Sequence, residues 1–69
     1  MVEIFKTDIA DTANADLIVG HLMKFFPSAK INVDVEDCDK VLRIEDNSIS
    51  ITEVIQLTKD VGCVCEVIM

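Results

Sequence analysis

Apolar and polar residues alternate in two neighbouring segments of the chain, which is the pattern of half-buried β-strands. The polar stretch 36–39 (Glu-Asp-Cys-Asp) separates the two segments, and Arg43 lies at an outward position of the second. We therefore predict a β-hairpin with strands over residues 30–36 and 40–45. Its inward positions are Ile31, Val33, Val35, Leu42 and Ile44.

Two more strands are predicted near the ends of the sequence. Val2 and Ile4 alternate with Glu3, so a first strand begins here and extends as far as Ile9. The almost wholly apolar run 63–69 predicts the last strand. Each of these strands is separated from the hairpin by a segment with helical spacing.

The first helix is predicted from Thr12 to Phe26. Asp11 or Thr12 can cap its start, and Pro27 ends it. The apolar residues that share one helical face, and are therefore expected to point inward, are Ile18, Leu22, Phe25 and Phe26.

The second helix begins with a capping box formed by Ser50 and Glu53. Gly62 lies where a helix C-terminus favours a left-handed residue. The buried stripe predicted for this helix is Ile51, Val54, Ile55, Thr58 and Val61.

The order strand, helix, strand, strand, helix, strand predicts a split βαβ arrangement. We expect an α+β fold of the ferredoxin-like βαββαβ class, with a four-stranded antiparallel sheet and both helices on one face. Residues 1–69 are expected to form a single domain.

Composition narrows the classes of function. The chain has 13 acidic and six basic residues, and its net charge of −7 disfavours nucleic acid and anionic membranes as partners. We expect no signal peptide and no membrane span. Three cysteines are an odd number, which suits free thiols in a reducing compartment and predicts a cytoplasmic protein.

The segment INVDVEDCDKVLRIEDNSISITEVIQLTKDVGCVCEVI resembles the hairpin, the capped second helix and the Gly step into the last strand of heavy-metal-associated domains. That family includes copper chaperones and the N-terminal modules of metal-pumping ATPases. The resemblance implies a soft-metal loop, Met-x-Cys-x-x-Cys, between the first strand and the first helix.

The sequence departs from the family pattern at that loop. The two cysteines would fall near Asp11 and Asn14, and the stretch from Thr7 to Asn14 contains no cysteine. A carboxylate and an amide are hard ligands that bind Cu(I) weakly. The aromatic residue expected after Gly62 is also replaced, by Cys63.

The remaining sulfur lies elsewhere in the chain. Cys63 and Cys65 share one face of the last strand, which the apolar pattern directs toward the helices, so we expect them to pack in the core. Cys38 lies among acidic residues in the hairpin turn, and these should oppose thiolate formation. The alternative is that Cys63, Cys65 and Cys38 ligate a soft metal.

The single histidine, His21, lies off the apolar stripe and is expected to be solvated. The first helix also carries more apolar residues than one stripe needs. Val19, Met23 and Phe26 lie at the edge of this stripe and predict an interaction surface, the alternative being a wide core stripe.

We therefore predict a non-enzymatic binding or interaction domain that resembles a heavy-metal-associated domain without its metal-binding cysteines. No cofactor and no catalytic residue are expected, and the partner is a second copy or another protein. One alternative is a Cu or Zn carrier that uses Cys63, Cys65 and Cys38. A second is a small-molecule regulatory domain, because amino-acid-binding ACT domains share this strand order.

Overall fold

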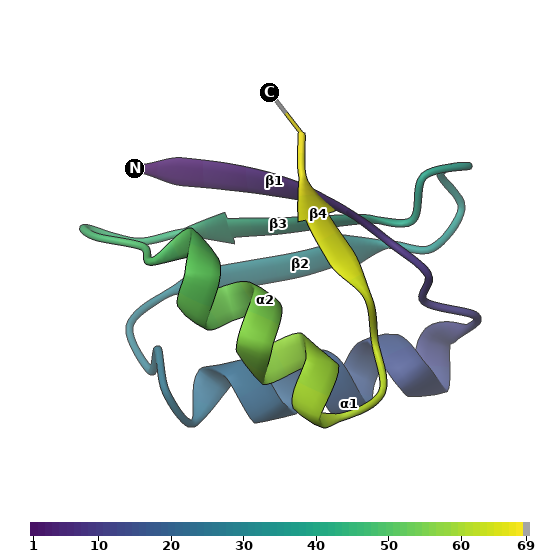
Figure 1. Ribbon diagram of the computed structural model, residues 1–69, viewed down its shortest axis with the longest axis horizontal. Coiled ribbons are helices and arrows are strands. Elements are labelled where there is room, and N and C mark those ends of the chain that lie inside the picture. Colours follow the sequence, from purple (N-terminus) through teal and green to yellow (C-terminus); the bar gives the residue numbers. More distant parts are fainter. Residues whose placement is uncertain (69) are drawn as a thin grey trace.

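Four strands form one antiparallel sheet, and two helices cover one of its faces (Figure 1). The elements of this computed structural model, which describes residues 1–68, are β1 (Val2–Thr7), α1 (Thr12–Met23), β2 (Lys30–Asp34), β3 (Val41–Glu45), α2 (Ile51–Asp60) and β4 (Cys65–Val67). The predicted ferredoxin-like βαββαβ fold is confirmed. Neither α1 nor α2 has the length and apolar character needed to cross a membrane.

The strands lie in the order β2-β3-β1-β4, so β1 and β3 are central and β2 and β4 form the edges. Phe5 of β1 pairs with Leu42 of β3 on one side and with Val67 of β4 on the other. This register places β1 across the middle of the sheet. It also brings the C-terminal strand beside the N-terminal one.

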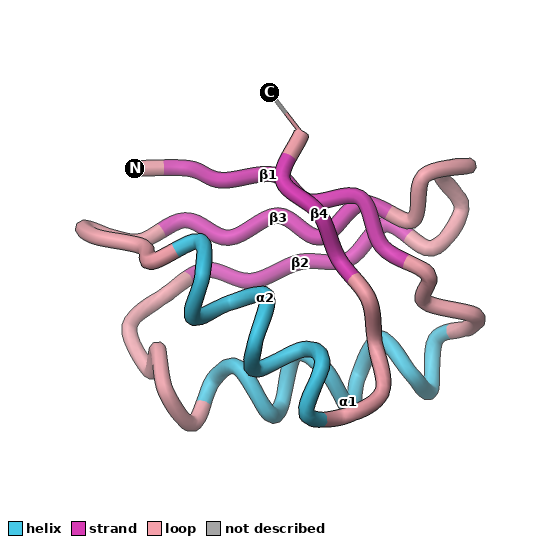
Figure 2. The backbone as a smooth tube through the Cα atoms, viewed as in Figure 1, coloured by secondary structure: helices cyan, strands magenta, loops and turns pink. Residues whose placement is uncertain are grey.

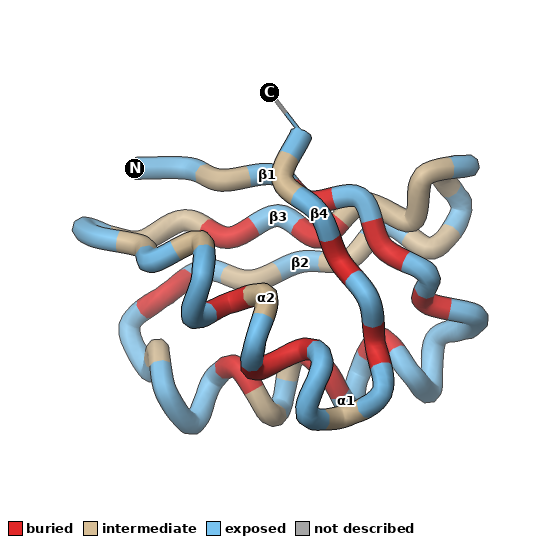
Figure 3. Tube along the Cα trace, in the orientation of Figure 1, coloured by how far each residue is buried: buried red, intermediate tan, exposed pale blue. Residues whose placement is uncertain are grey.

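The core lies between the helical layer and the covered face of the sheet (Figure 3). Its fully buried side chains are Phe5, Leu22, Leu42, Ile44, Val54 and Thr58. The inward positions predicted in β3 are confirmed. Those predicted in β2 are half-buried, because β2 is an edge strand, and Leu57 is a core residue that the predicted stripe of α2 omitted.

In β1 the residues that face the core are Phe5 and Thr7, not the apolar residues at the start of the strand. Phe5 and Thr7 are buried beneath the helices, whereas Val2 and Ile4 are 40% and 38% exposed. Since successive residues of a strand point to opposite faces, Val2 and Ile4 lie on the open face of the sheet.

Helix α1 ends three residues earlier than predicted. The backbone N–H groups of Phe25 and Phe26 both donate to the carbonyl of Leu22, which turns the chain out of the helix before Pro27. Phe25 was expected inward but is 52% exposed, because helical spacing no longer applies after the helix has ended.

Both ends of α2 follow their sequence signals. The Ser50 hydroxyl accepts a hydrogen bond from the Glu53 N–H at 3.2 Å. Gly62 has φ +83°, and the N–H groups of Gly62 and Cys63 donate to Lys59 and Thr58, which forms a Schellman motif. The last strand is shorter than predicted, and Met69 lies outside the described residues.

Candidate functional site

Three connections meet at one end of the sheet: β1–α1, β2–β3 and α2–β4 (Figure 2). The Thr7 N–H donates to the Asp39 carbonyl at 3.0 Å, which ties the end of β1 to the hairpin turn. The Asp8 N–H donates to the Val64 carbonyl at 3.2 Å, and the Val64 N–H donates back to Asp8 Oδ1 at 2.9 Å. Hydrogen bonds therefore tie the start of the loop that precedes α1 to both neighbouring connections.

Asp11 and Asn14 close the first turn of α1. Asp11 has an extended backbone, with φ −157°, and its Oδ1 accepts a hydrogen bond from the Asn14 N–H at 2.9 Å. Its carbonyl accepts from the Ala15 N–H at 3.0 Å. Asp11 is thus the N-cap of α1, one of the two caps that the sequence predicted, and its carboxylate satisfies an N–H group that the helix leaves unpaired.

A buried apolar residue anchors the same loop. Ile9 is 3% exposed, and its N–H donates to the Thr7 hydroxyl at 3.3 Å. A small pocket of about 60 Å³ remains between this loop and the α2–β4 connection, with Asp8, Asn14 and Cys63 among its walls. Pockets that hold drug-sized ligands have volumes of roughly 300–1,000 Å³, so this one is too small for such a ligand.

Cys63 and Cys65 are both buried, as the apolar pattern predicted. The Cys65 sulfur lies 3.1 Å from the Thr58 hydroxyl. Burial, and after it the neighbouring Asp8 carboxylate, together raise the pKa of the Cys63 thiol to about 12, because both make a negative charge on the sulfur unfavourable. Burial also raises the pKa of Cys65. Both sulfurs are therefore neutral thiols at neutral pH, whereas metals bind the thiolate.

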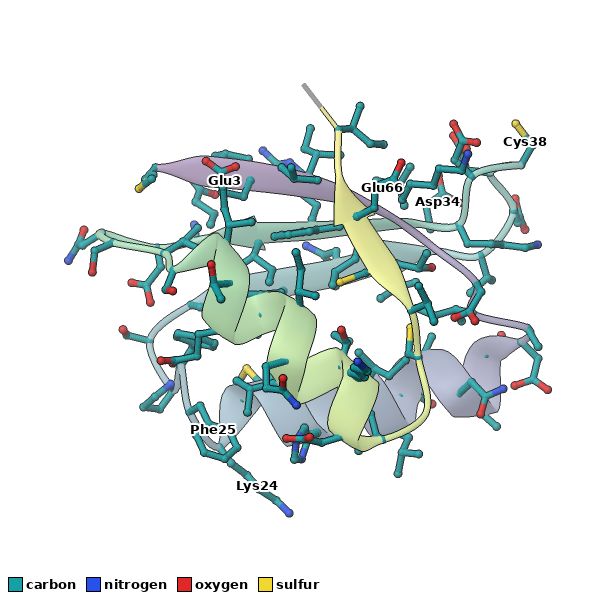
Figure 4. All side chains as sticks on the ribbon, viewed as in Figure 1. Glu3, Lys24, Phe25, Asp34, Cys38 and Glu66 are labelled. Atoms are coloured by element: carbon teal, nitrogen blue, oxygen red, sulfur yellow. The ribbon has the colours of Figure 1, made fainter. Side chains whose placement is uncertain are left out.

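Cys38 is exposed at the tip of the β2–β3 turn, where it points away from the sheet (Figure 4). Ligand atoms of Asp37, Cys38 and Asp39 lie within 4.8 Å of one another, and across residues 1–68 this is the one group of three or more such side chains. Asp37 Oδ1 already accepts the Asp39 N–H at 2.8 Å. The set Cys63, Cys65 and Cys38 is not gathered at that distance within the described part of the chain.

His21 differs from the prediction of a solvated side chain. It is half-buried, and its Nε2 atom is shielded from solvent without a hydrogen-bond partner among residues 1–68. The Phe25 ring packs against it edge-on, with centroids 5.4 Å apart. The turn that ends α1 brings Phe25 back over the imidazole, and this covering could not be read from helical spacing.

The predicted interaction surface lies on α1 and the turn after it. Met23 is 40% exposed, Val19 is half-buried, and Phe26 is half-buried because it packs against the core. Sequence reasoning missed two apolar side chains that are more exposed than Met23, Leu17 at 56% and Phe25 at 52%. Phe25 projects from the end of α1 away from the sheet (Figure 4).

Comparison with known proteins identifies the fold. No protein-family model matches the chain, and no curated protein matches it. A solved structure described as a gold binding protein has a TM-score of 0.85 at 13% identity, over 96% of this chain and 98% of that one. The copper transporter domain CCC2A of yeast, solved in apo and Cu(I)-loaded states, has a TM-score of 0.82 at 16% identity, over 99% and 94%.

These similarities establish a fold like that of heavy-metal-associated domains. One neighbour is described as gold-binding and the other as part of a copper transporter, and neither description names an enzyme. At 13% and 16% identity the likeness concerns the fold alone.

Proposed function

We propose that this chain is a non-enzymatic interaction domain, built on a heavy-metal-associated-like fold whose metal-binding cysteines have been lost. One observation carries the proposal: Asp11 and Asn14, which stand where the resemblance implies two cysteines, form the capped first turn of α1. The turn is complete without a metal. The Asp11 carboxylate already accepts a hydrogen bond from the Asn14 N–H.

The chemistry of the remaining sulfur supports the same proposal. Cu(I) prefers thiolate ligands, and Asp11 and Asn14 offer only oxygen and amide groups. Cys63 and Cys65 are close to this loop, but burial favours their neutral forms. A metal would have to displace a proton from each buried thiol and bring a further ligand into the core.

The surface proposed for the partner is the flank of α1 that bears Val19 and Met23. Leu17 lines the small pocket beside the α2–β4 connection, so its side of the helix faces α2. Val19 follows Leu17 by about 200° around the helix axis, at 3.6 residues per turn, and Met23 lies one turn further along the same flank. An apolar flank that turns away from α2 is available to a partner.

Metal titration tests the loss of the soft-metal site. Cu(I) is added anaerobically, against a competing chelator, to the native chain and to a Cys63→Ser/Cys65→Ser variant. We expect both to bind Cu(I) equally weakly. Stoichiometric binding with a sub-micromolar Kd in the native chain, lost in the double variant, would contradict the proposal.

Sedimentation velocity tests the interaction surface. Met23→Lys should weaken association, because it introduces a charge into the apolar flank. The matched control is the reverse substitution, Lys24→Met, at the next position along the chain, which is exposed to solvent. A strictly monomeric native chain, together with no effect of Met23→Lys on any association, would contradict this part.

A metal carrier is the second candidate. The observation that favours it is the cluster of Asp37, Cys38 and Asp39 at the hairpin tip, whose ligand atoms lie within 4.8 Å. Zn(II) titration of the native chain and of Cys38→Ser tests this candidate directly. The small-molecule alternative stays a prediction, which a thermal-shift screen with amino acids tests.

A further inference from the structure

We propose that β2 pairs with the same strand of a second copy in antiparallel orientation, centred on Asn32. Lys30 of each copy then lies opposite the partner's Asp34, and the two sheets join into one. This inference rests on the proposed interaction function and names its partner.

The first observation is an open edge of the sheet. β2 pairs with β3 alone in the described part of the chain, so its other side presents unpaired backbone groups. Proteins commonly protect such an edge with a proline, a bulge, an inward-pointing charge or an exposed lysine, and of these β2 has only Lys30, whose charge Asp34 balances. β2 reads Lys-Ile-Asn-Val-Asp, and its two inward residues are Ile31 and Val33. The edge is therefore suited to pairing.

The second observation is the symmetry of the five residues. A two-fold axis perpendicular to the sheet keeps both helical layers on the same side, so outward residues meet outward residues. With Asn32 at the axis, both ends of the pairing bring a cation opposite an anion. Ile31 meets the partner's Val33 on the covered face. Opposite charges and β-branched pairs across strands are both stabilising.

The third observation is the position of the apolar flank of α1. α1 packs against β2 on the covered side of the sheet (Figure 1). Because Leu17 faces α2, helical spacing places Val19 and Met23 on the side of α1 turned away from α2. Pairing of the two β2 strands brings α1 beside the partner's α1. Met23, now 40% exposed, would be covered there. The apolar flank and the open edge thus form one continuous surface.

A charge swap tests this register. Sedimentation equilibrium of the full chain at ~100 μM should show a dimer for the native sequence, and Lys30→Glu and Asp34→Lys should each weaken dimerisation roughly tenfold. The double variant Lys30→Glu/Asp34→Lys restores both opposite-charge pairs and should recover the native Kd. Asp34→Lys reduces the net negative charge of −7 and would strengthen association if only overall repulsion mattered. Asp34 Oδ1 also accepts the N–H groups of Glu36 and Asp37 in the hairpin turn, so Lys30→Glu, which leaves that turn intact, is the more specific single variant.

Lys6 and Glu66 provide the matched control. They pair across β1 and β4, away from β2. Lys6→Glu therefore changes the net charge as Lys30→Glu does, and Glu66→Lys as Asp34→Lys does, without touching the proposed interface. We expect both to leave the Kd unchanged. A native monomer at ~100 μM, or a double swap that fails to restore association, overturns the inference. If Met23→Lys abolishes a dimer that the charge variants leave intact, the β2 pairing is wrong while the proposed interaction function stands.

Discussion

The carboxylate of Asp11 accepts a hydrogen bond from the backbone N–H of Asn14 at 2.9 Å and so closes the first turn of α1. The same two positions are those at which the resemblance implies a pair of metal-binding cysteines. A side chain that caps a helix and a side chain that holds a metal have different requirements. The cap needs one acceptor oxygen, whereas Cu(I) needs polarisable sulfur. The Asp11 carboxylate meets the first requirement.

The cap predicts a measurable contribution to stability. Asp11→Ala leaves the Asn14 N–H without its acceptor and should lower the free energy of unfolding by about 1 kcal/mol. Asp11→Ser should retain most of the stability, because a serine hydroxyl accepts the same bond. Urea denaturation monitored by circular dichroism measures both. Equal stability of the alanine variant and the native chain would show that the cap is dispensable.

The two glycines predict substitutions of opposite sign. Gly62 has φ +83°, so Gly62→Ala should destabilise by about 1 kcal/mol although no atom lies within 4 Å of the added Cβ. Gly20 lies within α1 and is equally uncrowded, so Gly20→Ala should stabilise by about 0.5–1 kcal/mol. Thermal unfolding of the two variants checks both. The same sign for both substitutions would be inconsistent with this backbone geometry.

Thiol labelling distinguishes the three cysteines. At pH ~8 a disulfide reagent should modify Cys38 alone in the folded chain, because Cys63 and Cys65 are buried. All three should react in denaturant. Mass spectrometry counts the modified residues, and Cys38→Ser should leave the folded chain unlabelled. Rapid modification of all three without denaturant would contradict the burial of Cys63 and Cys65.

The raised pKa of Cys63 predicts a loss of stability in alkali. The folded-state pKa of about 12 exceeds the ordinary value of 9.0, so the unfolded chain releases this proton first. The stabilisation is complete below pH 9.0 and is lost as the pH rises toward about 12. At pH ~10 the loss from this thiol should be about 1 kcal/mol.

Urea denaturation at pH ~8 and pH ~10 measures this loss. Cys63→Ala is the control, since it keeps the lysines, which titrate in the same range, and removes the thiol. The native chain should lose more stability than Cys63→Ala between the two pH values. Parallel losses would indicate that Cys63 titrates in the folded chain as it does in the unfolded one.

Local signals in the sequence predicted most of the fold. Alternation identified the hairpin, the Ser50 cap and Gly62 marked the ends of α2, and Asp11 was one of two expected caps for α1. These features depend on a few neighbouring residues. Their physical cause, hydrogen bonding or a positive φ, is therefore visible in the sequence.

The predictions from the sequence failed where the structure depends on the end of a helix or on contacts between distant segments. The helical spacing of Phe25 continued in the sequence after the helix had ended at Met23, so its exposure and its contact with His21 were missed. Among the site residues, Asp8 lies close to Cys63, although the two are 55 positions apart in the sequence. No local sequence pattern predicts this contact. The absence of cysteine before α1 was visible at once, but the hydrogen bond from Asn14 to Asp11 required the structure.

The most direct test of the central claim replaces the cap with the implied ligands. If the fold is intact and only the ligands are missing, Asp11→Cys/Asn14→Cys should bind one Cu(I) per chain with a sub-micromolar Kd. A helix N-terminus also favours the thiolate form of such cysteines. The native chain and Asp11→Ser/Asn14→Ser should bind at least about 100-fold more weakly, given the softness of the ligands. Anaerobic Cu(I) titration that shows equally tight binding by the native chain would contradict the account.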